Sequence, residues 1–136
     1  MQFDYPQKVL FRHCDPAGII FYPRYFEMVN DLVEAFFDRA LGWPFEEMLK
    51  THGVPTAEIR LRFAAPSRHG DQLRLGLRVT RLGASSMTLA LHARSEDGET
   101  RFEGEQVLVH VDQAAGGRPS PWPERIRATI QAELDR

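Results

Sequence analysis

The stretch PRYFEMVNDLVEAFFDRA, residues 23–40, decides the fold that this sequence predicts. Acidic residues fill much of it, and apolar residues recur at spacings of three and four, at Phe26, Val29, Val33, Phe36, Phe37 and Ala40. This period is typical of an amphipathic helix with one buried face. Pro23 suits a first helical turn, and Gly42 followed by Pro44 ends the segment. We therefore expect one helix of about 18 residues, roughly 27 Å long.

The period of the apolar residues changes to two after a short helical piece that ends at Gly53. Alternating runs occupy residues 58–63, 73–80, 87–94 and 107–111, and a further strand is expected before the helix at KVLFRH, residues 8–13. The turns at residues 82–85 and 96–99 are short, so neighbouring strands should be antiparallel. The alternation slips at Gly104, which predicts a β-bulge there.

This order of elements predicts an α+β fold in which an antiparallel five-stranded sheet wraps around one long central helix. We expect residues 1–136 to form a single domain, with residues 113–136 as a linker and a C-terminal helix. Ile126, Ile130 and Leu134 share one side of that last helix. The other face of the sheet, or its edge, is then a candidate surface for self-association.

The composition is that of an ordinary globular protein, with 43% hydrophobic and 26% charged residues. The net charge of −2 gives no general attraction to nucleic acid or to an anionic membrane. No stretch approaches the roughly 18 apolar residues of a membrane span, and the first residues lack the features of a signal peptide. A single cysteine, Cys14, cannot form an internal disulfide. We therefore expect a cytoplasmic protein.

Several familiar catalytic devices are absent from the sequence. It contains no G-x-S-x-G elbow, no glycine-rich phosphate loop, and no zinc-ligand spacing among its five histidines and Cys14, so no metal is expected. His92 and His110 fit surface or hydrogen-bonded positions on strands. Cys14 fits a small buried apolar residue, with a reactive thiol as the alternative.

The segment HCDPAGIIFYPRYF, residues 13–26, holds the most suggestive acidic residue. Asp15 lies between the end of one strand and the start of the long helix, and Pro16, Ala17 and Gly18 place little bulk around it. The first helical turn offers unpaired N–H groups that polarise a carbonyl, while a carboxylate attacks its carbon or activates a water. The alternative is that Asp15 only caps a turn or the helix.

The same segment closely resembles the opening signature of the 4-hydroxybenzoyl-CoA thioesterase family, which has the hotdog fold. The matching features are CDPAG, the pair Ile19-Ile20, the pair Phe21-Tyr22, and then Pro23 and Tyr25. The order of elements over about residues 7–112 agrees with the hotdog plan, and RLGASSM resembles a turn between two central strands of that family. His13 stands where one branch has a second aspartate, so a 4-hydroxybenzoyl preference does not follow.

The resemblance implies an acyl-CoA thioesterase acting on an aromatic or a short to medium aliphatic acyl group, with no cofactor besides the CoA of the substrate. It implies that Asp15 is the nucleophile or general base, that the Tyr22 backbone N–H polarises the thioester carbonyl, and that Gly18 shapes the loop between them. Residues expected at the substrate are His13, Pro16, Ser85, Ser86, Arg68 and Arg81, with Arg24 a weaker candidate. The family forms homodimers, often paired into homotetramers.

Two other functions stay open at this point. A hotdog hydratase or dehydratase uses a histidine and a carboxylate on an acyl thioester, and His13 beside Asp15 is compatible with that chemistry. A non-catalytic acyl-CoA-binding protein would keep the pocket without turnover. Each arginine named above also fits a solvated surface charge.

Overall fold

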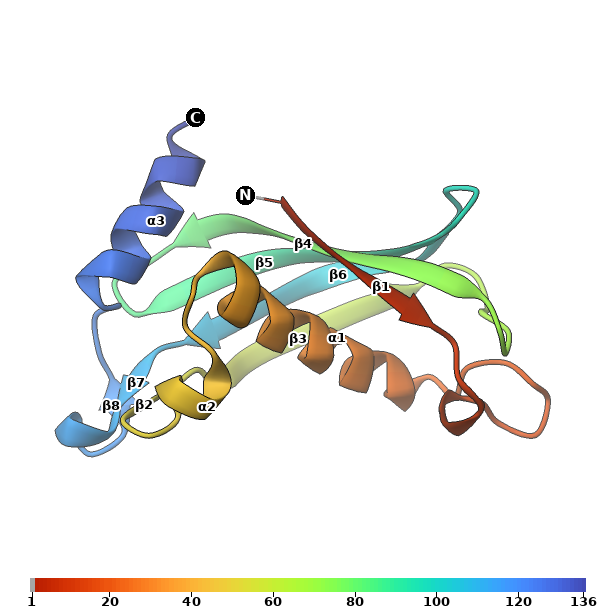
Figure 1. The fold of residues 1–136 in the computed structure, drawn as a ribbon, viewed down its shortest axis with the longest axis horizontal. Coiled ribbons are helices and arrows are strands. Elements are labelled where there is room, and N and C mark those ends of the chain that lie inside the picture. Colours follow the sequence, from red (N-terminus) through yellow and green to blue (C-terminus); the bar gives the residue numbers. More distant parts are fainter. Residues whose placement is uncertain (1) are drawn as a thin grey trace.

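The computed structural model describes residues 2–136, which form a curved antiparallel sheet with a long helix across its concave side (Figure 1). The strands are β1 Gln2–Lys8, β2 His52–Gly53, β3 Thr56–Phe63, β4 Gln72–Leu82, β5 Ser86–Ser95, β6 Thr100–Val109, β7 Val111–Asp112 and β8 Arg118–Pro119. The helices are α1 Pro23–Ala35, α2 Phe45–Met48 and α3 Glu124–Leu134. The α+β plan expected from the sequence is confirmed.

The large sheet has the strand order β1-β4-β5-β6-β3, and every neighbouring pair is antiparallel. The two hairpins β4–β5 and β5–β6 use the turns that the sequence predicted. β1 and β3 form the edges of this sheet, while β2, β7 and β8 make a small separate sheet. The central strands therefore come from the second half of the chain, and α1 precedes most of the sheet that encloses it.

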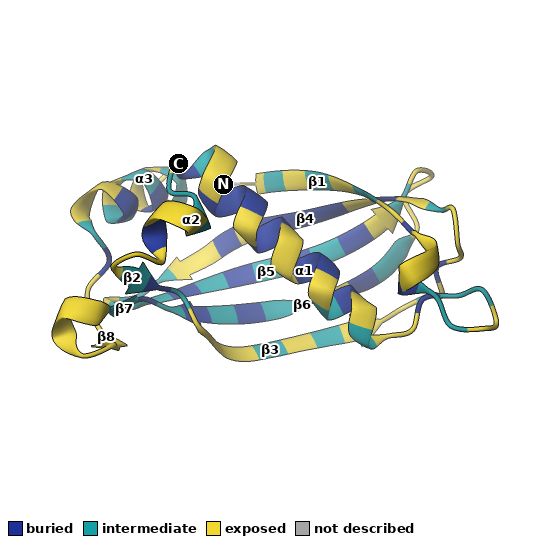
Figure 2. Cartoon of the chain, turned by 60° about the horizontal axis from the view of Figure 1, so that its bottom comes forward, coloured by how far each residue is buried: buried dark blue, intermediate teal, exposed yellow. Residues whose placement is uncertain are grey.

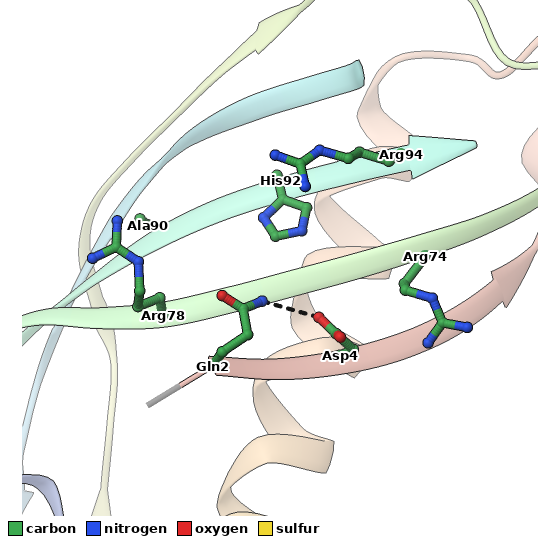
Figure 3. Close-up of a pocket in the computed structure, with 7 residues that line it drawn as sticks. All are labelled: Gln2, Asp4, Arg74, Arg78, Ala90, His92 and Arg94. Carbon is green, nitrogen blue, oxygen red and sulfur yellow. Dashed lines mark hydrogen bonds between the residues drawn. The ribbon is translucent and has the colours of Figure 1, made fainter. Parts of the chain in front are cut away.

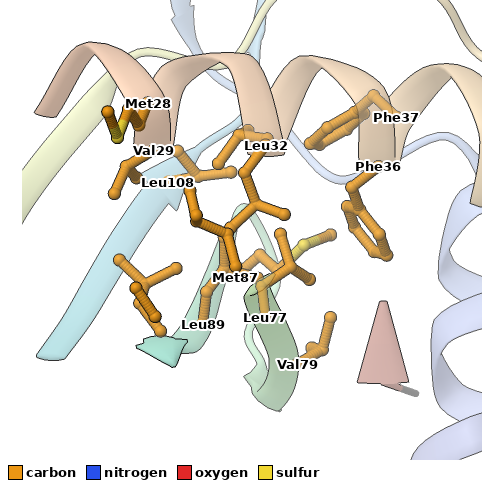
Figure 4. Close-up of a cluster of buried hydrophobic side chains, with 14 of the residues drawn as sticks. Met28, Val29, Leu32, Phe36, Phe37, Leu77, Val79, Met87, Leu89 and Leu108 are labelled. Carbon is orange, nitrogen blue, oxygen red and sulfur yellow. The ribbon is translucent and has the colours of Figure 1, made fainter. Parts of the chain in front are cut away.

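One side of α1 is buried against the sheet and the other side faces solvent (Figure 2). The buried residues are Tyr25, Met28, Val29, Leu32, Val33 and Ala35. They meet the inward side chains of the central strands, such as Leu77, Leu89 and Leu108 (Figure 4). The buried stripe is wider than the predicted one, because the curved sheet reaches around the helix to Tyr25 and Leu32 while Phe26 is only half-buried.

The helix widens at its end into a π-helical turn, Phe36–Ala40, in which the amide of Leu41 donates to the carbonyl of Phe36. Phe36 and Phe37 are adjacent in sequence and both fully buried. Helical residues thus continue to Ala40, where the sequence predicted the end of the helix.

The first strand lies earlier in the chain than predicted. β1 ends at Lys8, and Phe11–His13 form a 3₁₀ turn, so the expectation of a strand at residues 8–13 is wrong. The physical reason is local, because the Leu10 amide donates to His13 Nδ1 (2.9 Å) and closes the turn. In β1, Phe3, Tyr5 and Gln7 are the less exposed side chains of the alternation.

The β6 strand differs from the prediction in two ways. Gly104 pairs in register with Leu61 and with Leu91, and the register shifts of the sheet occur elsewhere, so no bulge lies at Gly104. Leu108 faces the core, whereas Val107 and Val109 lie half-buried on the other face. The alternation was misread because both faces of this strand end are apolar, and because the inward Gln106 bonds to Thr56 Oγ1 (2.9 Å).

The C-terminal segment packs against the body of the domain. Of the three residues that were expected to share one side of α3, Ile126 and Ile130 are buried and Leu134 is half-buried. The linker-like residues before α3 are also held in place by Trp122. Its indole N–H donates to the Ser86 carbonyl (3.0 Å), and its backbone amide donates to the Ala84 carbonyl. Over residues 2–136, none of the helices has the length and apolarity needed to cross a bilayer.

We predict that Gly104→Ala lowers the free energy of unfolding by about 1–3 kcal/mol, because the new Cβ would overlap the backbone carbonyl oxygen of Arg60 on β3. Urea denaturation measures the change. Glu105→Ala is the matched control, since it removes only an exposed ion pair with Arg60 and should shift stability by less than about 0.5 kcal/mol. Equal unfolding midpoints for Gly104→Ala and the wild type would contradict the steric explanation.

Candidate active site

Asp15 lies in a tight turn between two short antiparallel segments. Cys14 pairs with Ile20, the Asp15 amide donates to the Ile19 carbonyl (2.9 Å), and the Gly18 amide donates to the Asp15 carbonyl (3.0 Å). Gly18 has φ +79°, a conformation that favours glycine, so its predicted role in shaping this loop has a backbone reason. The turn therefore holds the start of the Asp15 side chain in one place.

The Asp15 carboxylate both caps the turn and keeps acceptor capacity. Its Oδ1 accepts from the Ala17 amide (2.8 Å), which is the capping role considered as the alternative. Its Oδ2 accepts no hydrogen bond from any of residues 2–136. Asp15 is half-buried, and Pro16 beside it is exposed. One carboxylate oxygen is thus held by the protein and the other is available.

The turn is fastened to the segment that leads into β4. The Ile20 amide donates to the Ser67 carbonyl (2.9 Å), the His69 amide donates to the Gly18 carbonyl (3.0 Å), and Ile19 pairs with Arg68. Arg68 is therefore close to the Asp15 turn, as the prediction of a substrate contact requires. The two segments lie together at the end of the molecule where α1 begins (Figure 1).

The start of α1 offers an unused donor. The Phe21 amide donates to the His13 carbonyl (3.0 Å), the Arg24 amide donates to the Phe21 carbonyl (2.9 Å), and Pro23 has no N–H. Between them, the Tyr22 amide has no acceptor among the described residues. This N–H lies at the positive end of the helix dipole, where a developing negative charge is stabilised.

His13 and Cys14 precede Asp15, and the pKa of each is shifted in the direction that favours its uncharged form. His13 is buried and its Nδ1 accepts from the Leu10 amide, while burial, followed by the Arg12 charge, lowers its pKa. The Cys14 thiol lies 3.5 Å from the Leu10 carbonyl, and desolvation, followed by the Asp15 charge, raises its pKa. No hydrogen bond between His13 and Asp15 occurs in residues 2–136, so the geometry does not favour a hydratase pair.

An apolar hollow of about 290 Å³ adjoins Tyr22 at this end of the molecule. Its lining is Ile19, Ile20, Tyr22, Tyr25, Phe63, Ala64, Ala65, Pro66 and Ser67. Phe63 stacks on Tyr25 with ring centroids 5.6 Å apart. It stays 43% exposed, although the alternation of β3 places it on the same face as Ile59 and Leu61. A small, largely apolar group fits such a lining.

A series of hydrogen-bonded polar side chains holds Tyr25, one of the residues that line this hollow. The Tyr25 hydroxyl and Ser67 Oγ are 2.8 Å apart, and Arg101 Nη1 donates to Ser67 Oγ (3.1 Å) and to Asp71 Oδ2 (2.7 Å). Burial raises the pKa of Tyr25, and the hydrogen bond from Arg101 lowers the pKa of Asp71. Sequence reasoning missed Ser67, Asp71 and Arg101, because their contacts join segments 30 to 42 residues apart.

The remaining predicted substrate residues do not gather around Asp15 within one chain. Ser85, Ser86 and Arg81 lie at the β4–β5 hairpin, at the opposite end of the sheet from the Asp15 turn (Figure 1). Arg24 is near the site, but its guanidinium pairs with Glu27 (2.6 Å) on the helix surface. Over residues 2–136, no group of three or more His, Cys, Asp or Glu side chains is arranged to hold a metal ion.

Residues 9–130 match the family model of the thioesterase-like superfamily. The chain is 30% identical over 135 residues to the L-carnitine dehydrogenase/betainyl-CoA thioesterase of Agrobacterium fabrum, covering 94% of this chain but 27% of that protein. It resembles the structure of a gentisyl-coenzyme A thioesterase at 26% identity and a TM-score of 0.84, covering 94% of this chain and 99% of that one.

A 1,4-dihydroxy-2-naphthoyl-CoA thioesterase from Synechocystis has a TM-score of 0.88 at 18% identity, with 100% of this chain and 99% of that chain covered. At that identity the likeness concerns the fold alone, and it confirms the predicted hotdog fold.

We predict that the titration of His13 makes the folded protein less stable at acidic pH. Because its folded pKa lies below the ordinary value of 6.5, the unfolded chain binds a proton first as the pH falls. The free energy of unfolding should therefore decrease below about pH 6.5 and level off below the folded pKa. His13→Asn keeps an acceptor for the Leu10 amide but does not titrate, so urea unfolding at pH 7.5 to 5 should show the wild type losing stability relative to this variant. A pH-independent difference would contradict the assignment.

Proposed function

We propose, from the premise that this chain belongs to the thioesterase-like superfamily, that it hydrolyses an acyl-CoA thioester to a free acid and CoA. The observation that carries the proposal is that two polar groups at the same end of the molecule have no hydrogen-bond partner within residues 2–136. These are the free Oδ2 of Asp15 and the N–H of Tyr22 at the start of α1. A carboxylate and a fixed amide donor are the parts that acyl transfer from a thioester requires.

In the proposed reaction, the thioester carbonyl oxygen accepts a hydrogen bond from the Tyr22 amide, and the helix dipole stabilises the charge that develops on this oxygen. As nucleophile, Asp15 attacks the carbonyl carbon, the C–S bond breaks, the thiolate of CoA leaves, and water hydrolyses the resulting anhydride. As general base, Asp15 instead removes a proton from the attacking water. Both routes use a good leaving group and need no metal or redox cofactor.

The hollow beside Tyr22 is the proposed place of the acyl group. Its volume of about 290 Å³ and its apolar, aromatic lining suit an aromatic or a short to medium aliphatic chain. The names of two relatives, a betainyl-CoA and a gentisyl-coenzyme A thioesterase, agree with a compact acyl group. Phe63 and Tyr25 would contact it, with the Ser67 and Arg101 chain holding Tyr25 in position.

A second copy of the chain is proposed to complete the site. Strand β3 pairs only with β6, so its other edge is free within residues 2–136 to join the β3 of a partner. A twofold axis at an antiparallel junction brings the β4–β5 end of one sheet toward the Asp15 end of the other. Ser85, Ser86 and Arg81 would then meet the substrate in the partner's site, with Arg68 and Arg24 beside the CoA nucleotide. A homodimer, or a homotetramer of two dimers, follows.

We expect Asp15→Asn to keep the fold and to lower hydrolysis by about a hundredfold or more. Asparagine retains the Oδ1 acceptor for the Ala17 amide, so the variant removes charge without opening the turn. Thiol release from a panel of aromatic and aliphatic acyl-CoA esters measures the loss, and circular dichroism checks the fold. Asp38→Asn, an exposed helical carboxylate, is the control and should stay active. Full activity of Asp15→Asn on any acyl-CoA would refute the assignment.

If each site contains residues of both chains, two impaired variants should complement each other. We expect Ser85→Ala/Ser86→Ala to weaken hydrolysis, and Asp15→Asn to abolish most of it. Co-expressed as a mixed dimer, the two variants form one site with all its groups intact, which should restore about a quarter of wild-type activity in a random mixture. Absence of restored activity, or a fully active double-serine variant, would exclude the partner role of this hairpin.

A further inference from the structure

The convex face of the sheet, opposite α1, carries a hollow of about 440 Å³ that the proposed thioesterase chemistry does not use. The lining residues come from β1, β4 and β5, and they are Gln2, Asp4, Arg74, Arg78, Ala90, His92 and Arg94 (Figure 3). They alternate with core residues such as Leu75 and Leu77, which shows that they face away from the helix. Three of the seven are arginines and one is an acid.

Gly76 lies buried beneath the side chains of this basic hollow, and it pairs with Asp4 on one side and His92 on the other. A Cβ at Gly76 would overlap the His92 ring and would lie 2.8 Å from Nε2 of the Gln2 side chain. Glycine weakens a strand interior and marks a place where another group approaches closely. Gly76 therefore creates the depression over which His92 and Gln2 lie.

Arg74 and Arg94 occupy directly opposite positions on β4 and β5. Like charges in such a cross-strand pair repel and destabilise the sheet. Neither arginine forms an ion pair with any of residues 2–136, whereas the arginines at the other side of the same sheet do. There, Arg60 pairs with Glu105 and Arg62 pairs with Glu103. Arg74, Arg78 and Arg94 are thus three arginines of one hollow that form no ion pair within the described residues.

The acid in the hollow does not neutralise these arginines. Asp4 Oδ1 accepts from the Gln2 side-chain amide (2.9 Å), and no ion pair of Asp4 occurs in the described chain. Burial, followed by the Arg94 charge, lowers the pKa of His92, and the Asp4 charge opposes this shift. Three arginines and one aspartate line the hollow, while Glu103, opposite His92 on β6, already pairs with Arg62.

A second hollow continues from the first along the convex face. It is about 630 Å³ in volume, and both hollows share Arg74 and Arg94. The opposed pair therefore borders both hollows, and the lining of the second one also includes Glu96. Arg78 lies four residues from Arg74 along β4, roughly 13 Å away, at the far end of the first hollow.

We propose that this basic hollow is a binding site for a phosphate-bearing anion, in which Arg74 and Arg94 clamp one phosphate group and Arg78 contacts a second anionic group. Guanidinium groups bind phosphate through paired, charge-assisted hydrogen bonds. An anion between Arg74 and Arg94 replaces their repulsion by two attractions. The spacing to Arg78 favours an extended ligand, such as a polyphosphate or a nucleotide with separated phosphates, over a single phosphate.

Isothermal titration calorimetry tests this site with two probes, inorganic diphosphate and 3′,5′-ADP, in a low-salt buffer free of phosphate. We expect saturable binding of at least one probe, weakened about tenfold or more by Arg94→Gln and by Arg74→Gln. Because 3′,5′-ADP is also the nucleotide part of CoA, only the binding that Arg74→Gln and Arg94→Gln weaken counts for this hollow. Within that part, tighter binding of 3′,5′-ADP would identify a nucleotide as the source of the phosphate, and equal binding would identify the phosphate alone. Arg118→Gln, an exposed arginine outside the hollow, is the charge-matched control and should bind normally.

A second readout separates site binding from diffuse attraction. A bound anion should raise the pKa of His92, followed by the proton NMR signal of its ring, in the wild type but not in Arg94→Gln. Thermal unfolding should show the probe stabilising the wild type more than that variant. These measurements require no turnover of a thioester, so their outcome is independent of the proposed hydrolase activity.

Three results would overturn the proposal. The first is no saturable binding of either probe, and the second is binding that Arg74→Gln and Arg94→Gln leave unchanged. The third is a change in sedimentation mass on replacing either arginine without any anion binding, which would make the convex face a contact between copies of the chain.

Discussion

Burial of one side of α1 in the concave face of the sheet is the constraint on which the rest of the structure depends. Leu32, Phe36 and the strand residues they meet are almost wholly removed from solvent, and a core substitution such as Leu32→Ala typically costs about 2–5 kcal/mol. This packing fixes where α1 begins, because the helix cannot slide without exposing its wide apolar stripe. The position of the Tyr22 amide, and of the Asp15 turn bonded to the segment before β4, follows from it.

Periodicity was sufficient to predict the long helix, four of the five strands of the large sheet and the tight turns between them. It failed where two local solutions compete. At residues 8–13 the alternation resembled a strand, but the His13 ring closes a turn with the Leu10 amide. In β6, valines and Leu108 alternate on two apolar faces, so the pattern did not show which face is inward. Asp15 and Tyr22 came from a contiguous motif, whereas the Tyr25, Ser67 and Arg101 contacts join distant segments and left no such signal.

The two faces of the sheet carry different chemistry for a physical reason. The concave face is filled by α1, and the end of this helix where the Tyr22 amide has no acceptor among the described residues also presents the Asp15 carboxylate. On the convex face, Arg74 and Arg94 occupy opposed positions, and Gly76 leaves the space that the His92 ring and the Gln2 side chain fill. β3 is an edge strand of the large sheet within residues 2–136. If the β3 strand of a second copy paired with it, the sheet would become wider, and so would both its concave and its convex face.

The central claim is that a thioester carbonyl lies between Asp15 and the amide of Tyr22. A crystal structure of the Asp15→Asn protein with an unhydrolysed acyl-CoA tests it most directly. The account predicts the carbonyl oxygen within about 3 Å of the Tyr22 nitrogen, the carbonyl carbon facing the side chain of residue 15, and the acyl group in the hollow lined by Phe63. A thioester bound elsewhere, with the Tyr22 amide still unpaired, would contradict it.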